Sequence, residues 1–347
     1  MENLKITLLG IGGSGCNMIN YVYKDFKDNK NIRLLSANTD IQSLNINNAN
    51  LKIVLGNSGL GAGMKPEIGK ISAEFSEKDI KKQLEGSNLL IIVTGLGGGT
   101  GSGASPVIVK YAKELGIQTV GLITLPFRFE GNKRNKIAKT TLSELENLLD
   151  SLIIIDNNSI FKIIDKKIGH KEALNEVNEI LKKTLKAIIN IVFNYNENDI
   201  NVDFNDLRTI LGHKGKGIFT YSKGNTAKEA IENVLNNKLF EYINLEKANG
   251  ILVNFTLNEK YPLTEIEEAM NFIYEHANEN TDIIFGTYTN NDIKEVEVAV
   301  IITGINNQPK QKRKIDIMNY FTSIRKEIKN ENFDDILDQP TFLRMNA

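Results

Sequence analysis

The chain of 347 residues contains one cysteine and three histidines. Because Cys16 has no second cysteine to pair with, no disulfide can form within the chain, which favours a reducing compartment. The histidines lie far apart, without the spacing of a metal-binding motif, at His170, His213 and His276. These scarcities exclude a disulfide-stabilised fold and the common zinc-binding motifs.

Long apolar runs and an excess of one charge are also absent from the sequence. No apolar stretch approaches the roughly 20 residues of a membrane-spanning helix, and the N-terminus shows no signal-peptide pattern. The 42 Lys and Arg residues balance 43 Asp and Glu residues, so the net charge is -1. A broad positive surface for nucleic-acid phosphates is therefore not expected. We expect a cytoplasmic protein that makes no direct contact with nucleic acid.

Short β-branched runs alternate with helix-like segments from Lys5 to about Ile155. Three of these runs, at 6–9, 89–93 and 119–124, carry apolar residues on both faces. Such runs predict an α/β fold with a Rossmann-like parallel sheet that helices cover on both sides. Sheets of this kind bind ligands beyond the carboxyl ends of their strands.

Apolar residues at helical spacing predict a long central helix over Lys171–Phe193. Beyond it the sequence predicts strands and helices of a smaller α/β domain, with strands near 250–255, 282–285 and 296–302 and helices near 226–235 and 263–276. We expect a first domain at 1–170, the central helix segment at 171–200 and the smaller domain at 201–305. The length agrees with about two domains.

The last residues of the sequence differ in character from the rest. A basic cluster at Lys310–Lys314 begins a segment, 306–332, that we interpret as a short linker, part of which could form a helix. Residues 333–347 read as a peptide that follows this linker.

The segment Gly10–Gly15 fits G-x-G-x-x-G between a predicted strand and a predicted helix. In that context the glycines let backbone N–H groups approach a phosphate at a helix N-terminus. Two alternatives remain open at this point. One is a dinucleotide-binding dehydrogenase, with Asp40 as its ribose-binding acid, and the other is a glycine turn that serves only close packing.

A second glycine-rich segment, Gly95–Gly103, follows another buried strand and precedes a helix expected over Ala104–Leu115. So many glycines cost chain entropy on folding, and packing alone gives no evident reason for them. We therefore expect a loop whose N–H groups, with the hydroxyls of Thr100 and Ser102, surround a di- or triphosphate. A dehydrogenase has no obvious use for this second loop, and neither segment fits the P-loop pattern.

Several segments together resemble the tubulin/FtsZ GTPase superfamily. Gly97–Gly103 is similar to its signature loop, and the segments that match FtsZ in order and spacing are Gly10–Asn17, Asn38–Asp40, Gly59–Gly63 with Pro66–Glu67, Pro126–Gly131 with Arg134, and Asn201–Asp206. The final peptide Leu337–Arg344 is similar to the FtsZ tail that docks on membrane-tethering proteins. The resemblance covers nearly the whole chain and implies the tubulin/FtsZ fold, a GTP-binding domain joined by a central helix to a smaller α/β domain.

The resemblance implies GTP or GDP as the bound nucleotide, with Mg²⁺ held mainly by its phosphates and water. The residues it places around the phosphates and the rest of the nucleotide are Gly12, Gly13, Ser14, Asn38, Asp40, Ala62, Gly63, Gly97, Gly98, Gly99, Thr100, Gly101 and Ser102, with Glu130 and Arg134 at the ribose and Asn17, Asn157 and Glu179 at the guanine edge. A carboxylate suits guanine because it can accept from both the ring N–H and the exocyclic amine.

The resemblance also implies that hydrolysis needs two subunits. The segment Asn201–Asp206 would enter the nucleotide site of a neighbouring copy, with Asn201, Asp203 and Asp206 acting as catalytic residues on the attacking water. Without the resemblance, Asp203 as a helix N-cap and Asp206 as a first-turn acid would be the preferred explanation.

The implied protein is a GTPase that polymerises head to tail and forms the ring scaffold of bacterial cell division at the inner face of the membrane. Membrane contact would be indirect, through tethering proteins that bind Leu337–Arg344. Two alternatives stay open, a tubulin-like filament for DNA partition or another positioning role, and a nucleotide-binding scaffold with little hydrolysis.

Three positions depart from the family pattern. Glu179 stands where an Asp is usual, Leu174 where an aromatic ring packs on the guanine, and Met64-Lys65 where a small residue and an amide or acid are usual. Loss of a stacking ring is expected to weaken nucleotide binding by about 1 kcal/mol. Lys65 points either to the terminal phosphate or to solvent, and the solvated interpretation is preferred.

Overall fold

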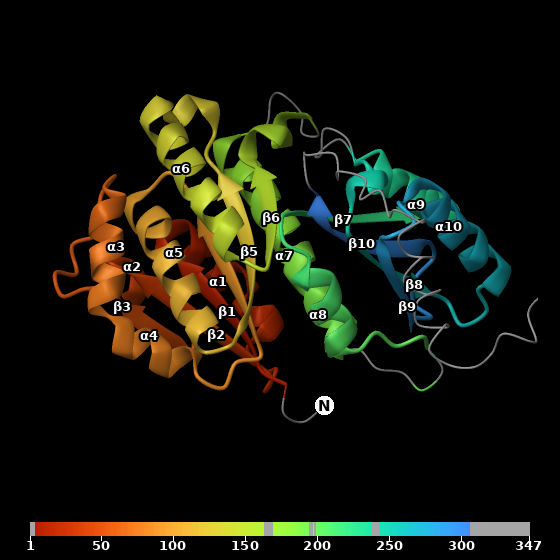
Figure 1. Cartoon of the computed structure of the whole chain (residues 1–347), viewed down its shortest axis with the longest axis horizontal. Coiled ribbons are helices and arrows are strands. Elements are labelled where there is room, and N and C mark those ends of the chain that lie inside the picture. Colours follow the sequence, from red (N-terminus) through yellow and green to blue (C-terminus); the bar gives the residue numbers. More distant parts are fainter. Residues whose placement is uncertain (1–3, 163–168, 194–196, 198, 238–242, 306–347) are drawn as a thin grey trace, which may run out of the picture. The chain divides into compact units, whose positions relative to one another are not determined.

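The computed structural model describes residues 4–162, 169–193, 197, 199–237 and 243–305. The predicted linker at 306–332 and the predicted docking peptide at 333–347 lie outside these residues. The described strands form one ten-stranded sheet in the order β3-β2-β1-β4-β5-β6-β7-β10-β8-β9 (Figure 1).

The first six strands of this sheet are all parallel. They are β1 (Ile6–Ile11), β2 (Ile32–Asn38), β3 (Leu51–Val54), β4 (Leu89–Gly95), β5 (Gln118–Leu125) and β6 (Ser151–Asp156). Every residue of β1 is buried, which is what a strand covered on both faces requires. The parallel sheet predicted from the apolar runs is thus confirmed.

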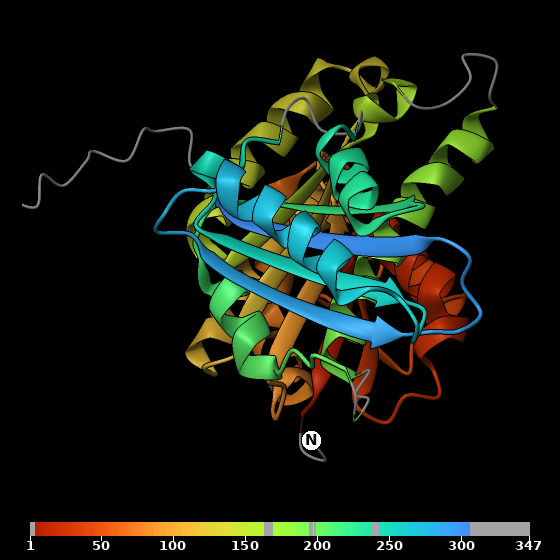
Figure 2. The same ribbon diagram turned by 90° about the vertical axis from the view of Figure 1, so that its right-hand side faces the viewer.

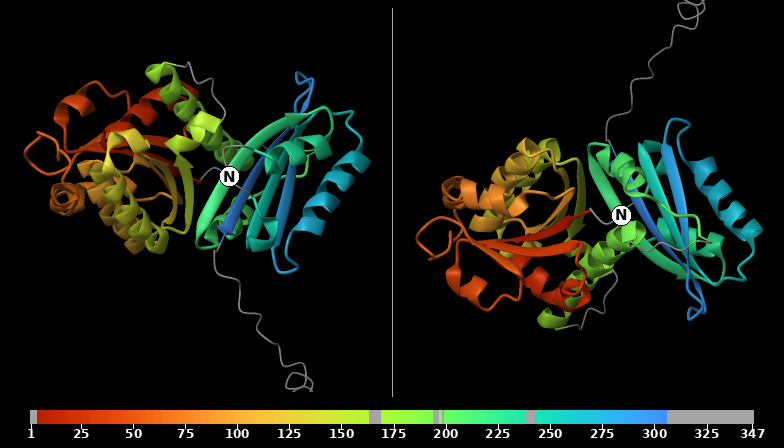
Figure 3. Two further views of the ribbon diagram at one scale, coloured as in Figure 1. Left: turned by 90° about the horizontal axis from the view of Figure 1, so that it is seen from above. Right: turned by 90° about the horizontal axis from the view of Figure 1, so that it is seen from below.

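Helices cover both faces of these strands, as the two views of Figure 3 show. Leu8 of β1 packs in a core with α1 (Gly12–Phe26) and α7 (His170–Phe193), the predicted central helix. Its neighbour Leu9 points the other way, into a second core. That core is built with α3, α4, α5 and α6, which span Pro66–Phe75, Glu77–Leu84, Gly99–Glu114 and Asn132–Leu148. The alternation follows from the two-residue period of a strand.

The remaining four strands carry the predicted smaller α/β part. They are β7 (Lys216–Gly224), β8 (Gly250–Leu257), β9 (Asp282–Thr289) and β10 (Val296–Ile305). One face packs against α9 (Ala227–Leu235) and α10 (Leu263–His276), which lie together in front of the strands in Figure 2. On the other face Leu252 and Ile301 join the core that contains α7.

The junction between the two sets of strands was not predicted from the sequence. Strand β6 pairs with β7 in parallel through only two residue pairs, Leu152 with Lys216 and Ile153 with Gly217. The alternating, partly exposed β7 gives a weaker apolar signal than the buried strands, and its partner is chosen by tertiary contacts. The short ladder makes the sheet continuous.

Helix α3 lies directly on the first turns of α5, backbone against backbone. A Cβ atom at Gly103 would be 1.9 Å from the carbonyl oxygen of Pro66, and one at Gly69 would be 2.4 Å from that of Gly99. Both distances are far below any van der Waals contact, so this crossing requires glycine at both positions. The small side chain of Ala73, one turn after Gly69, is fully buried.

The glycine-rich segments are therefore not the loops that the sequence suggested. Helix α5 begins at Gly99 rather than near Ala104, and α1 begins at Gly12, directly after β1. The expectation that packing gives no reason for the second set of glycines was wrong, because Cβ atoms at Gly99, Gly101 and Gly103 would all collide with backbone oxygens. The shape of a helix-on-helix contact is invisible in a local sequence pattern.

Substitution of Gly103 tests the α3–α5 contact. Gly103→Ala should lower the free energy of unfolding by about 2 kcal/mol or more, because the added methyl group forces the helices apart. Gly212→Ala, at the end of α8 (Phe204–Gly212), is the matched control, since no atom lies within 4 Å of its Cβ position. Denaturant titration of both variants measures the effect. Equal stability of the two would contradict the close contact.

Candidate functional site

The starts of α1 and α5 meet at the carboxyl ends of the neighbouring strands β1 and β4. A Cβ atom at Gly12 would lie 2.9 Å from the backbone nitrogen of Gly101. Neither helix has a side-chain cap or an acidic residue in its first turn. N–H groups without a side-chain cap and the positive ends of two helix dipoles therefore converge, an arrangement that favours an anion such as a phosphate.

Two of the predicted phosphate-binding glycines border open space. At Gly13 and Gly98 no atom lies within 4 Å of a Cβ position, in contrast to the crowded Gly99 and Gly101. Gly13 and the adjacent Ser14 are exposed, and Gly98 is half-buried. A ligand can thus approach the backbone at the very start of both helices, while the glycines behind it hold the helices together.

The segment Gly59–Lys65 borders the same place. The N–H of Gly99 donates a hydrogen bond to the carbonyl oxygen of Gly63 at 2.8 Å, and Ala62 is buried beside it. This bond uses one of the N–H groups that the sequence assigned to the phosphates. Lys65 is exposed, and the choice between the terminal phosphate and solvent stays a prediction.

Several predicted polar residues are engaged within the protein. The hydroxyls of Thr100 and Thr39 lie 2.6 Å apart, and the Ser102 hydroxyl accepts the N–H of Gly97 at 2.9 Å. Asp40 caps the short helix α2 (Ile41–Asn45), and the buried Asn38 precedes it. These side chains order the site from within. Thr39 was not predicted as a site residue, although it stands between two that were.

Glu130 and Arg134 lie beside the glycine-rich turn that follows β4. A Cβ atom at Gly97 would be 3.3 Å from the Cβ of Arg134. The Arg134 guanidinium donates to Glu130 Oε2 at 2.8 Å, and the backbone N–H of Phe127 donates to Glu130 Oε1 at 2.9 Å. The pair is thus held next to the glycines, and its contact with the ribose stays a prediction.

The three residues predicted at the guanine edge differ in their surroundings. Asn17 is exposed on α1, and Glu179 of α7 accepts a hydrogen bond from the Tyr21 hydroxyl. Asn157, directly after β6, is 8% exposed, and its Oδ1 atom has no hydrogen-bond partner among the described residues. A buried acceptor without a donor costs free energy, which a bound ligand with N–H groups would recover.

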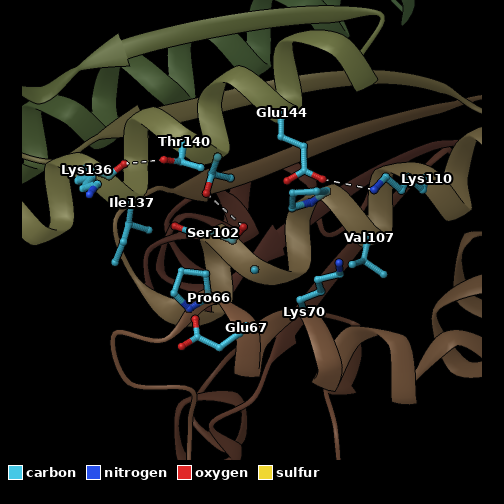
Figure 4. Close-up of a pocket in the computed structure, with 13 residues that line it drawn as sticks. Pro66, Glu67, Lys70, Ser102, Val107, Lys110, Lys136, Ile137, Thr140 and Glu144 are labelled. Carbon is cyan, nitrogen blue, oxygen red and sulfur yellow. Dashed lines mark hydrogen bonds and ion pairs between the residues drawn. The ribbon is translucent and has the colours of Figure 1, made fainter.

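A cavity of about 380 Å³ lies on the outer side of the α5 start, between α3, α5 and α6 (Figure 4). Pro66, Ile137 and Val107 supply much of its apolar wall. Ser102 lines the cavity too, and its carbonyl oxygen accepts the Thr141 hydroxyl at 3.4 Å. Ser102 therefore connects the glycine-rich turn to α6.

The predicted catalytic acids form the start of α8. Asp203 is its N-cap and accepts the N–H of Asp206 at 2.8 Å, while Asp206 Oδ2 accepts the N–H of Asp203 at 3.0 Å. This reciprocal pair is a capping box, which confirms Asp203 as a helix N-cap and Asp206 as a first-turn acid. Their free carboxylate oxygens remain available, because Asp203 is exposed and Asp206 half-buried. The side-chain amide of Asn201 donates to the Asp199 carbonyl oxygen at 3.0 Å.

The segment that leads into α8 is held against β9. The N–H of Thr287 donates to the Ile200 carbonyl oxygen at 2.9 Å, and the N–H of Thr289 donates to Asp199 at 2.8 Å. Gly286 makes room for this contact, because a Cβ atom there would lie 2.6 Å from Val202. Sequence reasoning missed Gly286. A glycine inside a strand-like run was the available signal.

The acids at the start of α8 and the glycines at the starts of α1 and α5 lie at opposite ends of β5. The Gln118 side chain, at the start of β5, donates to the Arg208 carbonyl oxygen of α8 at 3.0 Å. The N–H of Leu96 donates to the Thr124 carbonyl oxygen, near the end of β5, at 2.9 Å. With a rise of about 3.3 Å per residue, the six steps from Gln118 to Thr124 place these two contacts about 20 Å apart. One chain does not bring the two predicted halves of the site together.

Comparison with known proteins identifies the family of this chain. Residues 5–165 match the Tubulin/FtsZ family GTPase domain, and residues 215–306 match the FtsZ family C-terminal domain. The chain is 38% identical over 311 residues to the cell division protein FtsZ of Helicobacter pylori, which covers 87% of this chain and 80% of that protein. The chain belongs to the FtsZ family. It carries the GTPase domain of that family and is a GTPase.

Solved structures agree with this family assignment. The FtsZ dimer of M. jannaschii matches with a TM-score of 0.78 and 32% identity, over 87% of this chain and 89% of that one. CetZ2 of Haloferax volcanii, solved as a GTPγS-bound protofilament, matches with a TM-score of 0.75 over 94% of this chain and 99% of that one. At 16% identity, CetZ2 shows the fold alone.

The described part of this FtsZ-family chain has neither a candidate membrane-spanning helix nor a candidate metal cluster. Its helices include none that is both long enough and apolar enough to cross a membrane. Its His, Cys, Asp and Glu side chains form no group of three or more that could hold a metal ion.

Cys16 is buried in the folded protein. Its side chain is 1% exposed, and burial raises the pKa of its thiol to about 11. At pH 8 the folded protein should therefore incorporate no iodoacetamide, and the unfolded protein should incorporate one equivalent, as mass spectrometry would show. Labelling of the folded protein as fast as free cysteine would contradict this burial.

Proposed function

We propose that this GTPase polymerises head to tail, and that each GTP site is completed by the acids of the neighbouring subunit. The observation that carries the proposal is a distance of about 20 Å along β5. It separates Gln118, which contacts α8 and its acids, from Thr124, which contacts the glycine-rich turn after β4. A chain that carries both halves at opposite ends can join them only by meeting another copy. Repetition of such a heterologous contact produces a filament.

The nucleotide is GTP or GDP. Its phosphates lie on the starts of α1 and α5, at Gly12, Gly13 and Gly98–Gly101. The guanine edge meets Asn17, Asn157 and Glu179, and the unpaired Oδ1 of Asn157 supports a ligand with N–H donors there. Mg²⁺ would be held mainly by the phosphates and water, because the described side chains offer no metal cluster.

Hydrolysis uses Asp203 and Asp206 from the adjoining subunit, with Asn201 beside them. A carboxylate orients and polarises the attacking water and takes up its proton, as the water oxygen bonds to the γ-phosphorus and the bond from that phosphorus to the departing GDP breaks. The capping box fixes the directions of both carboxylates, and the contact with β9 fixes the segment that carries them. Prior fixation of this kind lowers the entropy lost when the water is positioned.

The filament acts in cell division, as the names of the H. pylori relatives indicate for those proteins. We assign residues 1–170 to the GTP-binding domain, 171–200 to the central helix segment and 201–305 to the domain that carries the catalytic segment. The tail peptide Leu337–Arg344 would dock on a membrane-tethering protein, with 306–332 as its linker, and so place the filament at the inner face of the membrane. Retention of both acids favours a hydrolysing filament over a passive nucleotide-binding scaffold.

Asp206→Asn separates catalysis from helix capping. The asparagine oxygen can still accept the Asp203 N–H, so stability and GTP binding should be preserved. Turnover should fall about 100-fold or more, because the charge that orients the water is lost. A steady-state phosphate-release assay, with nucleotide binding measured in parallel, checks both expectations.

The matched control is Thr226→Ala, which removes the N-cap bond to Glu229 at the start of α9. This variant should lose about 1 kcal/mol of stability and keep its turnover. Parental turnover in Asp206→Asn would contradict the assigned role of the carboxylate.

A further inference from the structure

Two polar contacts join α1 to α7 one helical turn apart. The Tyr21 hydroxyl donates to Glu179 Oε1, and Asp25 accepts from Lys182 at 3.2 Å and from Lys186 at 2.5 Å. The spacing of four residues on α1 places Tyr21 and Asp25 on the same face. The Lys182 ammonium group also lies 5.5 Å from the centre of the Tyr21 ring.

The groups around this contact fix the charge states of the Tyr21 phenol and the Asp25 carboxylate. The hydrogen bond to Glu179, helped by partial burial, raises the pKa of Tyr21 to about 12. Burial alone would raise the pKa of Asp25, but the ammonium groups of Lys186 and Lys182 outweigh it and lower that pKa. Tyr21 is therefore a neutral donor, and Asp25 an ionised acceptor, throughout the neutral range.

The bond to Tyr21 restricts the carboxylate of Glu179. A glutamate has one more rotatable bond than an aspartate, so a free Glu179 would lose more entropy on binding a ligand. With Oε1 hydrogen-bonded to Tyr21, the rotation of the carboxylate is restricted before any ligand arrives, and Oε2 remains to accept from a donor. Asn17, one turn before Tyr21 on α1, shares that face of the helix.

We propose that Tyr21 is a specificity-determining positioning residue, which aims Glu179 at the N–H edge of a guanine and so favours GTP over ATP. The inference rests on the proposed role of Glu179 in reading the base. Adenine lacks the ring N–H and the exocyclic amine at positions that a carboxylate can bridge, so only guanine benefits from the fixed acceptor. Tyr21 itself contacts the acid and not the nucleotide.

Tyr21→Phe is the direct test, since it removes the hydroxyl and keeps the ring. The dissociation constants of GTP and ATP would be measured by competition against a fluorescent GDP analogue, and kcat and KM for GTP by phosphate release. The dissociation constant of GTP should rise about tenfold and that of ATP should stay unchanged. The preference for GTP over ATP should therefore fall about tenfold. The KM for GTP should rise, while kcat at saturation stays within about twofold, because the reacting groups are untouched.

Asp25→Asn is the matched control in the same interface. It breaks the ion pairs with Lys182 and Lys186 and leaves Tyr21 and Glu179 in place. It should lower the melting temperature and leave the GTP-to-ATP preference unchanged. In a Glu179→Asp background, where the shorter acid no longer reaches the hydroxyl, Tyr21→Phe should have no further effect on the preference.

These measurements distinguish the positioning role of Tyr21 from the reading of guanine by Glu179. The positioning role would be overturned if Tyr21→Phe kept the parental preference for GTP over ATP, or if Asp25→Asn reduced that preference as much as Tyr21→Phe does. Either result would leave the proposed GTPase mechanism standing. A parent protein that binds ATP as tightly as GTP would overturn the reading of guanine by Glu179, and the inference with it.

Discussion

The contact of α3 with the first turns of α5 is made by backbone atoms, and the proposed nucleotide site depends on it. Carbonyl oxygens of Pro66 and Gly99 occupy the space where side chains at Gly103 and Gly69 would lie. The same absence of Cβ atoms lets the start of α1 touch Gly101. Three segments thereby converge at the ends of β1 and β4 with their backbones close together. In the proposed site, backbone N–H groups rather than a lysine would meet the phosphates.

At the opposite end of the sheet, side-chain hydrogen bonds hold the catalytic segment proposed at the start of α8. There the acids of α8 are fixed by reciprocal hydrogen bonds and by the strand β9, whose Gly286 leaves room for Val202. One pair of carboxylates thus caps a helix and still presents free oxygens outward. Structural and catalytic explanations of Asp203 and Asp206 are therefore compatible. Between the two ends runs α7, which Tyr21 and Asp25 tie to α1.

The sequence predicted the elements better than their contacts. Buried runs such as Leu89–Val93 and the periodic helices α7 and α10 were correctly placed, because burial on both faces or on one stripe leaves a local pattern. The glycines of α5 were misread as a loop, since a helix crossing depends on atoms far away in the chain. The β6–β7 pairing, the Gly286 contact and the Tyr21 bond to Glu179 were missed for the same reason. Each depends on a partner 60 or more residues distant in sequence, or on another strand.

The dependence of GTP turnover on protein concentration tests the shared active site most directly. If each site needs the acids of a neighbouring subunit, the rate per subunit should be near zero below a threshold concentration and rise steeply above it, as filaments form. Light scattering recorded on the same samples should increase at the same threshold. A rate per subunit that stays constant across the threshold would contradict the account, because a single chain would then hydrolyse GTP unaided.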